Sequence, residues 1–173
     1  MPTRHDEGFT LLELLIVVAI VSVITAIATP GLLRARMTSN EASAIASLKV
    51  TTSAQVAYSA SCGNGEYAPS FVTLATPVTP GGPGFLSEDL GNAVVPQKTG
   101  YTFSLGAGAG GGAGPNDCHG LPTNSAYYAT GVPIGFQATG TRSFAVNAGG
   151  VIWQLNLAIA PTEPFGAPAV PIQ

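Results

Sequence analysis

Residues 9–28 read FTLLELLIVVAIVSVITAIA, an apolar run whose polar side chains are Thr10, Glu13, Ser22 and Thr25. At 1.5 Å per residue, a helix of this length is about 30 Å long, which matches the hydrocarbon core of a bilayer. A carboxylate in such a helix raises the free energy of insertion, by about 2.5–3.5 kcal/mol mid-span and less towards the ends. The run therefore predicts a membrane-spanning helix, and Glu13 indicates that the helix does more than anchor the chain.

Two ordinary interpretations of this run are open. In the first, the helix is a simple membrane anchor, and Glu13 lies close enough to the interface to reach water. In the second, it is a secretory signal peptide that is cut after the small-residue triplet 26–28. The acid within the run, Asp6 and Glu7 before it, and Pro30 just beyond the cut weaken the second interpretation.

The start of the run gives a third interpretation. Residues 8–20 read GFTLLELLIVVAI, with a short polar leader before them, a glycine before the aromatic Phe9, and Glu13 four residues after it. This string resembles the N-terminal signature of type IV prepilins and type II secretion pseudopilins. The resemblance implies that a membrane aspartyl peptidase cuts between Gly8 and Phe9 and methylates the new amino group of Phe9. It also implies that the helix stays in the inner membrane until an assembly machine extracts it into a filament.

The same resemblance assigns roles to Glu13 and Pro30. In a filament core without water, an isolated carboxylate is strongly disfavoured, whereas a carboxylate paired with an ammonium group is tolerated. The resemblance implies that Glu13 of one subunit meets the Phe9 amine of its neighbour and so fixes the axial register. Pro30 falls where pilins often carry a helix-kinking proline. Because proline removes a backbone hydrogen bond, we predict a kink there.

The chain divides into a leader and three further parts. The parts are a leader peptide at 1–8, a transmembrane and filament-core helix at 9–29, a second half of that helix at 30–61, and a globular head at 62–173. Neither glycine nor proline occurs between Leu32 and Ser61, so the helix is expected to resume after Pro30. It must stop at the sequence CGNG of residues 62–65, where glycine and asparagine supply left-handed capping geometry.

The second half of the helix has two different sides. One side carries mostly small residues at three-and-four spacing: Ala35, Ser39, Ala42, Ala46, Val50, Ser53, Ala57 and Ala60. The opposite side is expected to face the head and carries Met37, Ala44, Ile45, Leu48, Thr52 and Val56. Small residues let helices approach closely, which favours helix packing within a filament. The other interpretation is that alanine is present simply because it forms helices well.

The head reads as loops and strands. Residues 67–97 read as a loop with scattered apolar anchors, and the proline-rich tail from Pro161 as an extended strap or disorder. Strand-like alternation occurs at 101–105, 126–129, 142–146 and 151–155. A hairpin turn at 147–150 joins the last two of these stretches. We therefore predict an α+β fold, in which a three- or four-stranded antiparallel sheet packs on the second half of the long helix.

The chain has two cysteines, Cys62 and Cys118. In an exported domain they are expected to form a disulfide, which stabilises the head by about 4 kcal/mol in the chain-entropy model. This disulfide would attach the end of the helix to a glycine-rich loop. Free thiols are one alternative, and a metal site using Asp117, Cys118 and His119, with or without Cys62, is another.

Other functions find little support. Six basic and nine acidic side chains give a net charge of −3, which excludes a basic nucleic-acid footprint. The G-x-G-x-x-G match at Gly106, Gly108 and Gly111 lacks the helix that a dinucleotide site requires, so we interpret it as a flexible loop. The acids weighed for calcium do not form an Asp-x-Asp cluster: Glu66, Glu88, Asp89, Asp117 and Glu163. No catalytic arrangement stands out, so we expect neither an enzyme, a cofactor nor a metal.

The sequence thus predicts a structural pilin subunit that polymerises through its N-terminal helix into a type IV pilus. Its expected partners are other copies of itself, the prepilin peptidase, the assembly machinery and, before assembly, the inner membrane. The subunit would then reside in an extracellular surface filament. The alternatives are a periplasmic major pseudopilin of a type II secretion system and a membrane-anchored binding module that does not polymerise.

Overall fold

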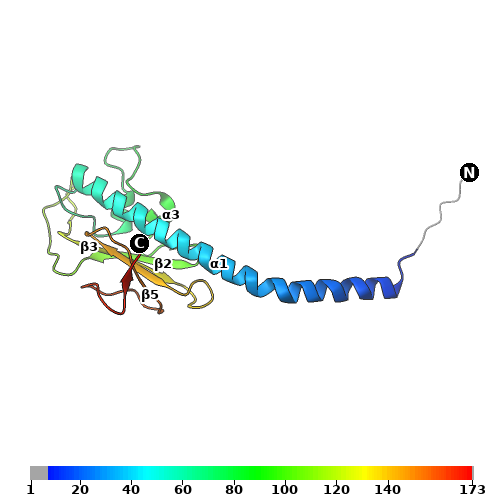
Figure 1. Ribbon diagram of the computed structural model, residues 1–173. Helices are drawn as coiled ribbons and strands as arrows, with labels where there is room; N and C mark the ends of the chain where they lie inside the picture. Colours follow the sequence, from blue (N-terminus) through cyan, green and yellow to red (C-terminus); the bar gives the residue numbers. More distant parts are fainter. Residues whose placement is uncertain (1–7, 173) are drawn as a thin grey trace, which may run out of the picture. The chain divides into compact units, whose positions relative to one another are not determined.

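The computed structural model describes residues 8–172, which fall into two compact units that divide after Arg36. Helix α1 (Leu11–Ser61) begins in the first unit and ends in the second (Figure 1). The long helix predicted from Phe9 to Ser61 is therefore confirmed, with a start two residues later than expected. Most of the predicted leader, residues 1–7, lies outside the described residues.

The first unit is an apolar helix without protein cover. Every residue from 8 to 36 is exposed. By length and composition, α1 is able to cross a membrane. Pro30 lies inside α1, and its nitrogen has no hydrogen to donate to the Ala26 carbonyl. The helix is assigned without interruption through this point, and the kink at Pro30 stays a prediction.

The second unit contains an antiparallel sheet in the order β1-β2-β3-β4-β5-β6. Its strands are β1 (Gln97–Lys98), β2 (Tyr101–Ala107), β3 (Tyr127–Pro133), β4 (Ser143–Asn147), β5 (Trp153–Leu155) and β6 (Val170–Pro171). Two short helices, α2 (Phe71–Ala75) and α3 (Glu88–Gly91), lie in the connection between α1 and β1. The predicted α+β class is confirmed.

The sheet has six strands rather than the predicted three or four. The four central strands, β2 to β5, overlap the four stretches of alternating sequence, although β3 runs four residues further than expected and β5 is shorter. The turn at 147–150 joins β4 to β5 as expected. The two additional strands form the edges, where β1 pairs with β2 and β6 pairs with β5. Each edge strand has two residues, too few for a period of two to be visible in the sequence.

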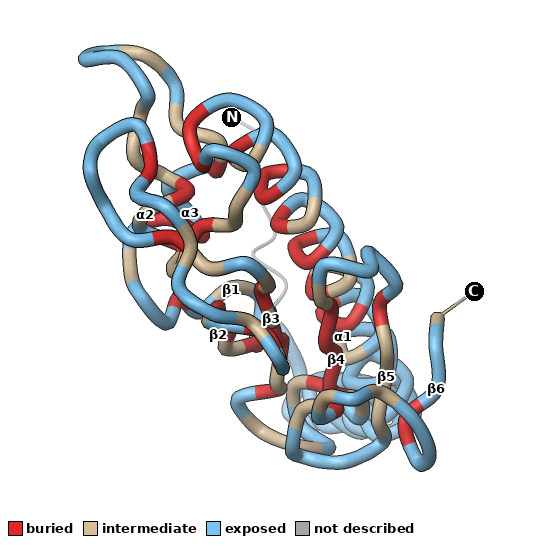
Figure 2. The backbone as a smooth tube through the Cα atoms, turned by 90° about the vertical axis from the view of Figure 1, so that its left-hand side faces the viewer, coloured by how far each residue is buried: buried red, intermediate tan, exposed pale blue. Residues whose placement is uncertain are grey.

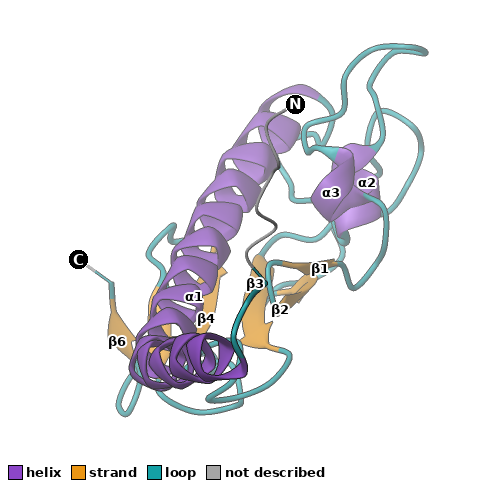
Figure 3. Ribbon diagram, turned by 90° about the vertical axis from the view of Figure 1, so that its right-hand side faces the viewer, coloured by secondary structure: helices purple, strands orange, loops and turns teal. Residues whose placement is uncertain are grey.

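The second part of α1 lies across one face of this sheet (Figure 3). Buried residues follow one side of the helix, and β4 is almost wholly buried (Figure 2). The core combines helix residues such as Leu48 and Tyr58 with the sheet aromatics Phe103 and Phe144, all essentially inaccessible to solvent. Burying side chains of this size is the main source of stability in a small head.

The burial of α1 agrees with the predicted two sides, with one exception. All eight residues of the small-residue side are exposed. On the opposite side, Ala44 and Leu48 are fully buried, and Met37, Ile45 and Thr52 are half-buried. Val56 is 60% exposed, so its assignment to the head-facing side was wrong. The head covers that side of the helix at the neighbouring Gln55, whose amide exchanges two hydrogen bonds of 2.9 Å with the backbone of Ala68.

A buried carboxylate attaches α1 to the turn before β4. Glu41 is 5% exposed and accepts hydrogen bonds from the backbone N–H and hydroxyl of Thr141, at 2.7 and 2.8 Å. It also accepts two from the Arg142 guanidinium, at 2.9 and 2.7 Å. Burial raises the pKa of Glu41, but these hydrogen bonds and the charge of Arg142 outweigh burial and hold the pKa below its ordinary value. Sequence alone could not pair residues so far apart in the chain.

The proline-rich tail forms the extended strap that the sequence suggested. It crosses the face of the sheet opposite α1, where the Tyr128 hydroxyl of β3 donates a hydrogen bond to the Pro161 carbonyl. The ring of Phe165 stacks on Trp153 with centroids 5.4 Å apart. The strap then ends as β6 at the sheet edge. Aromatic stacking and backbone pairing therefore order this segment despite its lack of periodicity.

Candidate functional site

The first candidate site is the start of α1. Gly8 and Phe9 precede the helix, and the Phe9 side chain is 75% exposed. Thr10 caps the helix, because its hydroxyl oxygen accepts a hydrogen bond from the Glu13 backbone N–H at 3.2 Å. Glu13 is exposed in the first helical turn, where the partial positive charge of the helix dipole favours a carboxylate. The sequence analysis missed the capping role of Thr10, although the Thr-x-x-Glu pattern before an apolar run signals it.

Cleavage between Gly8 and Phe9 would create a new charge at this end of the helix. A new ammonium group on Phe9 would add positive charge at the end of the helix that is already partly positive. It would therefore be destabilised unless a carboxylate were close. Glu13 is on the first turn of the same helix end, four residues further along the chain. The arrangement suits a carboxylate that balances an amino-terminal charge, either its own or that of a neighbouring chain.

The second candidate site is the other end of α1. Asn64 and Gly65 have the left-handed backbone conformation predicted for the helix stop, with φ of 53° and 89°. The predicted disulfide is present between Cys62 and Cys118, whose Cα atoms are 4.8 Å apart. The Cys118 backbone N–H also donates to the Cys62 carbonyl at 2.8 Å. The loop before β3 is thus attached to the end of α1 by a covalent bond and by a backbone hydrogen bond.

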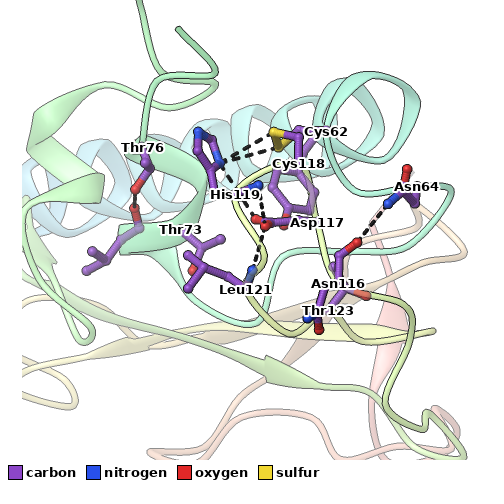
Figure 4. Close-up of polar contacts among 12 residues, drawn as sticks. Cys62, Asn64, Thr73, Thr76, Asn116, Asp117, Cys118, His119, Leu121 and Thr123 are labelled. Atoms are coloured by element: carbon purple, nitrogen blue, oxygen red, sulfur yellow. Dashed lines mark hydrogen bonds and ion pairs between the residues drawn. A yellow bond between two sulfur atoms is a disulfide. The ribbon is translucent and has the colours of Figure 1, made fainter. Parts of the chain in front are cut away.

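Asp117 organises this end of the helix (Figure 4). One of its carboxylate oxygens accepts from the backbone N–H groups of His119 and Leu121, both at 2.8 Å, and the other accepts from the Tyr58 hydroxyl at 2.8 Å. Burial raises the pKa of Asp117, but these hydrogen bonds outweigh burial and hold it below its ordinary value. Burial and the bond to Asp117 raise the pKa of Tyr58. The carboxylate therefore stays charged and fixes the turn.

His119 lies against the disulfide in the same turn (Figure 4). Its Nδ1 atom is 3.6 Å from the sulfur of Cys62, 3.4 Å from that of Cys118, and 3.9 Å from an oxygen of Asp117. Cys62 is buried, whereas Cys118 and His119 are exposed. Among residues 8–172, this is the only place where three or more His, Cys, Asp or Glu side chains bring possible metal ligands close together. In the oxidised chain, both sulfurs are used by the disulfide.

No three of the acids weighed for calcium converge within residues 8–172. Asp89 pairs with Lys98 at 2.5 Å, and Glu163 accepts hydrogen bonds from Asn147 and from the backbone of Ala109, both at 2.6 Å. Asp117 is committed to the turn described above. Asp89, Asp117 and Glu163 therefore each have a structural partner of their own in the described part of the chain.

Comparison with known families bears on the first of these two sites. The family described as the prokaryotic N-terminal methylation motif matches residues 3–29. This segment is a type IV pilin and pseudopilin signature. The resemblance drawn from the sequence is thereby confirmed for this segment, and the head lies outside the match. Neither the curated proteins nor the solved structures include a significant match to the chain.

The signature supports a pilin-like or pseudopilin subunit with an inner-membrane helix. Proteins with this signature are structural subunits, and the motif implies prepilin peptidase processing and assembly into filaments. The matched residues include the predicted cleavage pair, Gly8 and Phe9, together with Glu13. Cleavage, methylation of Phe9 and the register role of Glu13 remain predictions at these positions.

Proposed function

We propose that the chain is a structural pilin subunit that is cut between Gly8 and Phe9, methylated at Phe9, and polymerised through α1 into a type IV pilus. The observation that carries this proposal is the methylation motif, which lies on a segment whose described residues up to Arg36 are all exposed. Such an apolar surface must be covered by lipid or by other helices. In the proposed sequence of events, lipid covers it first and neighbouring subunits cover it afterwards.

The second part of α1 supports the same proposal. Its head-facing side is buried, and its other side is exposed and built from small residues. Small side chains allow other helices to come close, which suits packing of this helix inside a polymer. The head would then lie on the outside of the filament, with the strap and outer sheet face away from the helix bundle.

Glu13 carries the mechanism. In the filament core its carboxylate would pair with the methylated amino group of Phe9 on a neighbouring subunit. Removing one partner of a buried ion pair leaves an uncompensated charge, which costs about 3–5 kcal/mol. The same loss recurs with each subunit added. The pair therefore selects one axial register during assembly.

The experiment compares Glu13→Leu with Thr10→Ala. We expect the Glu13→Leu chain to insert in the membrane and to be processed normally. Few filaments should be recovered when the cell surface is sheared. Thr10→Ala removes only the hydrogen bond that caps α1, which is worth about 1 kcal/mol, and should assemble nearly as well as the wild type. The measurements are filament yield, membrane abundance and the intact mass of the mature chain.

Each alternative predicts a different result. Normal filaments from Glu13→Leu would refute the register role. An equal decrease in filament yield in both variants would show that Glu13 only stabilises the start of α1. A mature chain beginning at Thr29 would establish an ordinary signal peptide. Filaments confined to the periplasm would identify a secretion pseudopilin, and a mature chain that never forms multimers would identify an anchored binding module.

A further inference from the structure

We propose that the reduced head binds one Zn²⁺ ion through the sulfurs of Cys62 and Cys118 and the Nδ1 atom of His119. Two thiolates and an imidazole are the ligands that zinc prefers in proteins. The disulfide and the metal would then be alternative ways of attaching the same loop to the end of α1. This inference is independent of filament formation.

The position of the imidazole carries the argument. In a tetrahedral zinc site with Zn–S of about 2.3 Å and Zn–N of about 2.05 Å, the sulfur and nitrogen ligands are about 3.5 Å apart. His119 Nδ1 already lies 3.4 Å from the Cys118 sulfur and 3.6 Å from the Cys62 sulfur. The nitrogen is therefore already about as far from each sulfur as two ligands of one zinc ion are from each other.

Only the two sulfurs have to move. In the same geometry they would be about 3.8 Å apart, so reduction must let them separate by about 2 Å. The Cys62 side chain is buried at the end of α1, whereas Cys118 is exposed in a loop. Rotation of the Cys118 side chain therefore opens the site, and water takes the fourth zinc position.

The surrounding turn holds the imidazole in place. Asp117 accepts hydrogen bonds from the backbone N–H groups of His119 and Leu121 and from the Tyr58 hydroxyl. None of these bonds depends on the disulfide. With Nδ1 bound to zinc, the ring proton lies on Nε2, which the exposed position of His119 leaves open to water. The turn is therefore a preformed support for the ligand.

Opening the disulfide needs a two-electron reductant: a phosphine, which takes up the oxygen of a water molecule, or a dithiol, which reacts in two exchange steps. One thiolate of the dithiol attacks the exposed Cys118 sulfur, the S–S bond breaks, and Cys62 leaves as a thiolate. The second thiol of the reductant then resolves the mixed disulfide, so the reductant is oxidised to a disulfide and the head gains two electrons and two protons. Zinc binding releases the protons of the two cysteine thiols to solvent.

The test uses the full, unprocessed chain in detergent micelles, reduced without oxygen by an immobilised phosphine that is then removed. Co²⁺ serves as the spectroscopic probe and Zn²⁺ as its competitor. We expect the reduced chain to bind one Co²⁺ with tetrahedral d–d bands and thiolate charge-transfer bands, both abolished by one equivalent of Zn²⁺. The oxidised chain should give neither set of bands. Trp153 fluorescence reports whether the reduced head stays folded.

The matched variants are His119→Gln and His5→Gln, which remove the two histidines of the chain one at a time. His119→Gln should bind at least about tenfold more weakly, since even the loss of an outer-shell partner weakens metal binding by 10–100-fold. His5→Gln should bind as the wild type does. Equal affinity for wild type and His119→Gln overturns the proposal. So does a reduced chain without tetrahedral bands, whether it is folded or unfolded.

Discussion

The substitution Glu41→Gln tests how the head is held on the helix. The side chain keeps its shape, but one carboxylate oxygen becomes an NH₂ group that can no longer accept a hydrogen bond. If that group faces Arg142, two charge-assisted bonds are lost. The amide is therefore expected to keep its oxygen towards Arg142 and to turn its NH₂ group towards Thr141, leaving the Thr141 backbone N–H without its acceptor.

The magnitude follows from these contacts. Loss of a hydrogen bond to a charged group costs about 1.5–3 kcal/mol when the donor is left unsatisfied in a buried place. Thr141 is exposed and Arg142 half-buried, so water replaces part of what is lost. We therefore expect the free energy of unfolding to fall by about 2 kcal/mol at neutral pH. With an m-value of ~2 kcal/mol/M, this corresponds to a decrease of about 1 M in the urea midpoint.

The pH dependence separates charge from shape. The pKa of Glu41 is lower in the folded head than its ordinary value of 4.5, so its contribution is fully present above that value and is lost as the pH falls through the folded pKa. The Glu41→Gln variant has no proton to gain at this position. Its deficit relative to wild type should therefore shrink as the pH is lowered below about 4.5.

The assay is urea unfolding of the full chain in micelles, followed by the fluorescence of Trp153. This residue is the one tryptophan of the chain and lies in the sheet of the head. The control is Glu88→Gln, which makes the same chemical change at an exposed carboxylate. A deficit that is independent of pH, or one no larger than that of Glu88→Gln, would refute the assigned role of the Glu41 contacts.

Two further predictions concern the end of the helix. Alkylation of exported protein without reductant should leave Cys62 and Cys118 unmodified, and mass spectrometry showing a label on either would contradict the disulfide. Gly63→Ala should destabilise the head by about 1–3 kcal/mol, because the new methyl group would clash with the backbone carbonyl oxygen of Glu66 and lie 2.7 Å from the Tyr58 ring. Gly106→Ala is its control, since the added Cβ meets nothing within 4 Å. Equal midpoints for the two variants would contradict the predicted clash with the Glu66 carbonyl and the Tyr58 ring.

The main elements of the fold were predictable because their signals are local. An apolar run with a defined start, an alanine-rich stretch without glycine and the stop at residues 62–65 define α1. Four alternating stretches define the central strands. The edge strands and the short helices α2 and α3 were missed, because two to five residues carry too little periodicity and their formation depends on neighbours already in place.

The candidate sites were only partly predictable for a different reason. The two cysteines could be paired because there was one possible pairing. The contact of His119 with the Cys62 sulfur, and that of Glu41 with Arg142, join residues far apart in the chain. Such contacts depend on how the helix, the loop and the sheet are packed. No spacing in the sequence records them.

Because of these distant contacts, the two sides of the second part of α1 have different roles. The head covers the part of α1 that runs from about Asn40 to Tyr58, and it is attached near both ends of this part. Glu41 makes the attachment at one end, and Tyr58 and the neighbouring Cys62 make it at the other. Between these points, apolar packing covers one side of the helix and leaves the small-residue side open. Substitutions on the covered side should therefore act on unfolding of the head, whereas those on the open side should act on contacts with other molecules. The stability of the head and the assembly of a filament thus draw on different sides of the same helix.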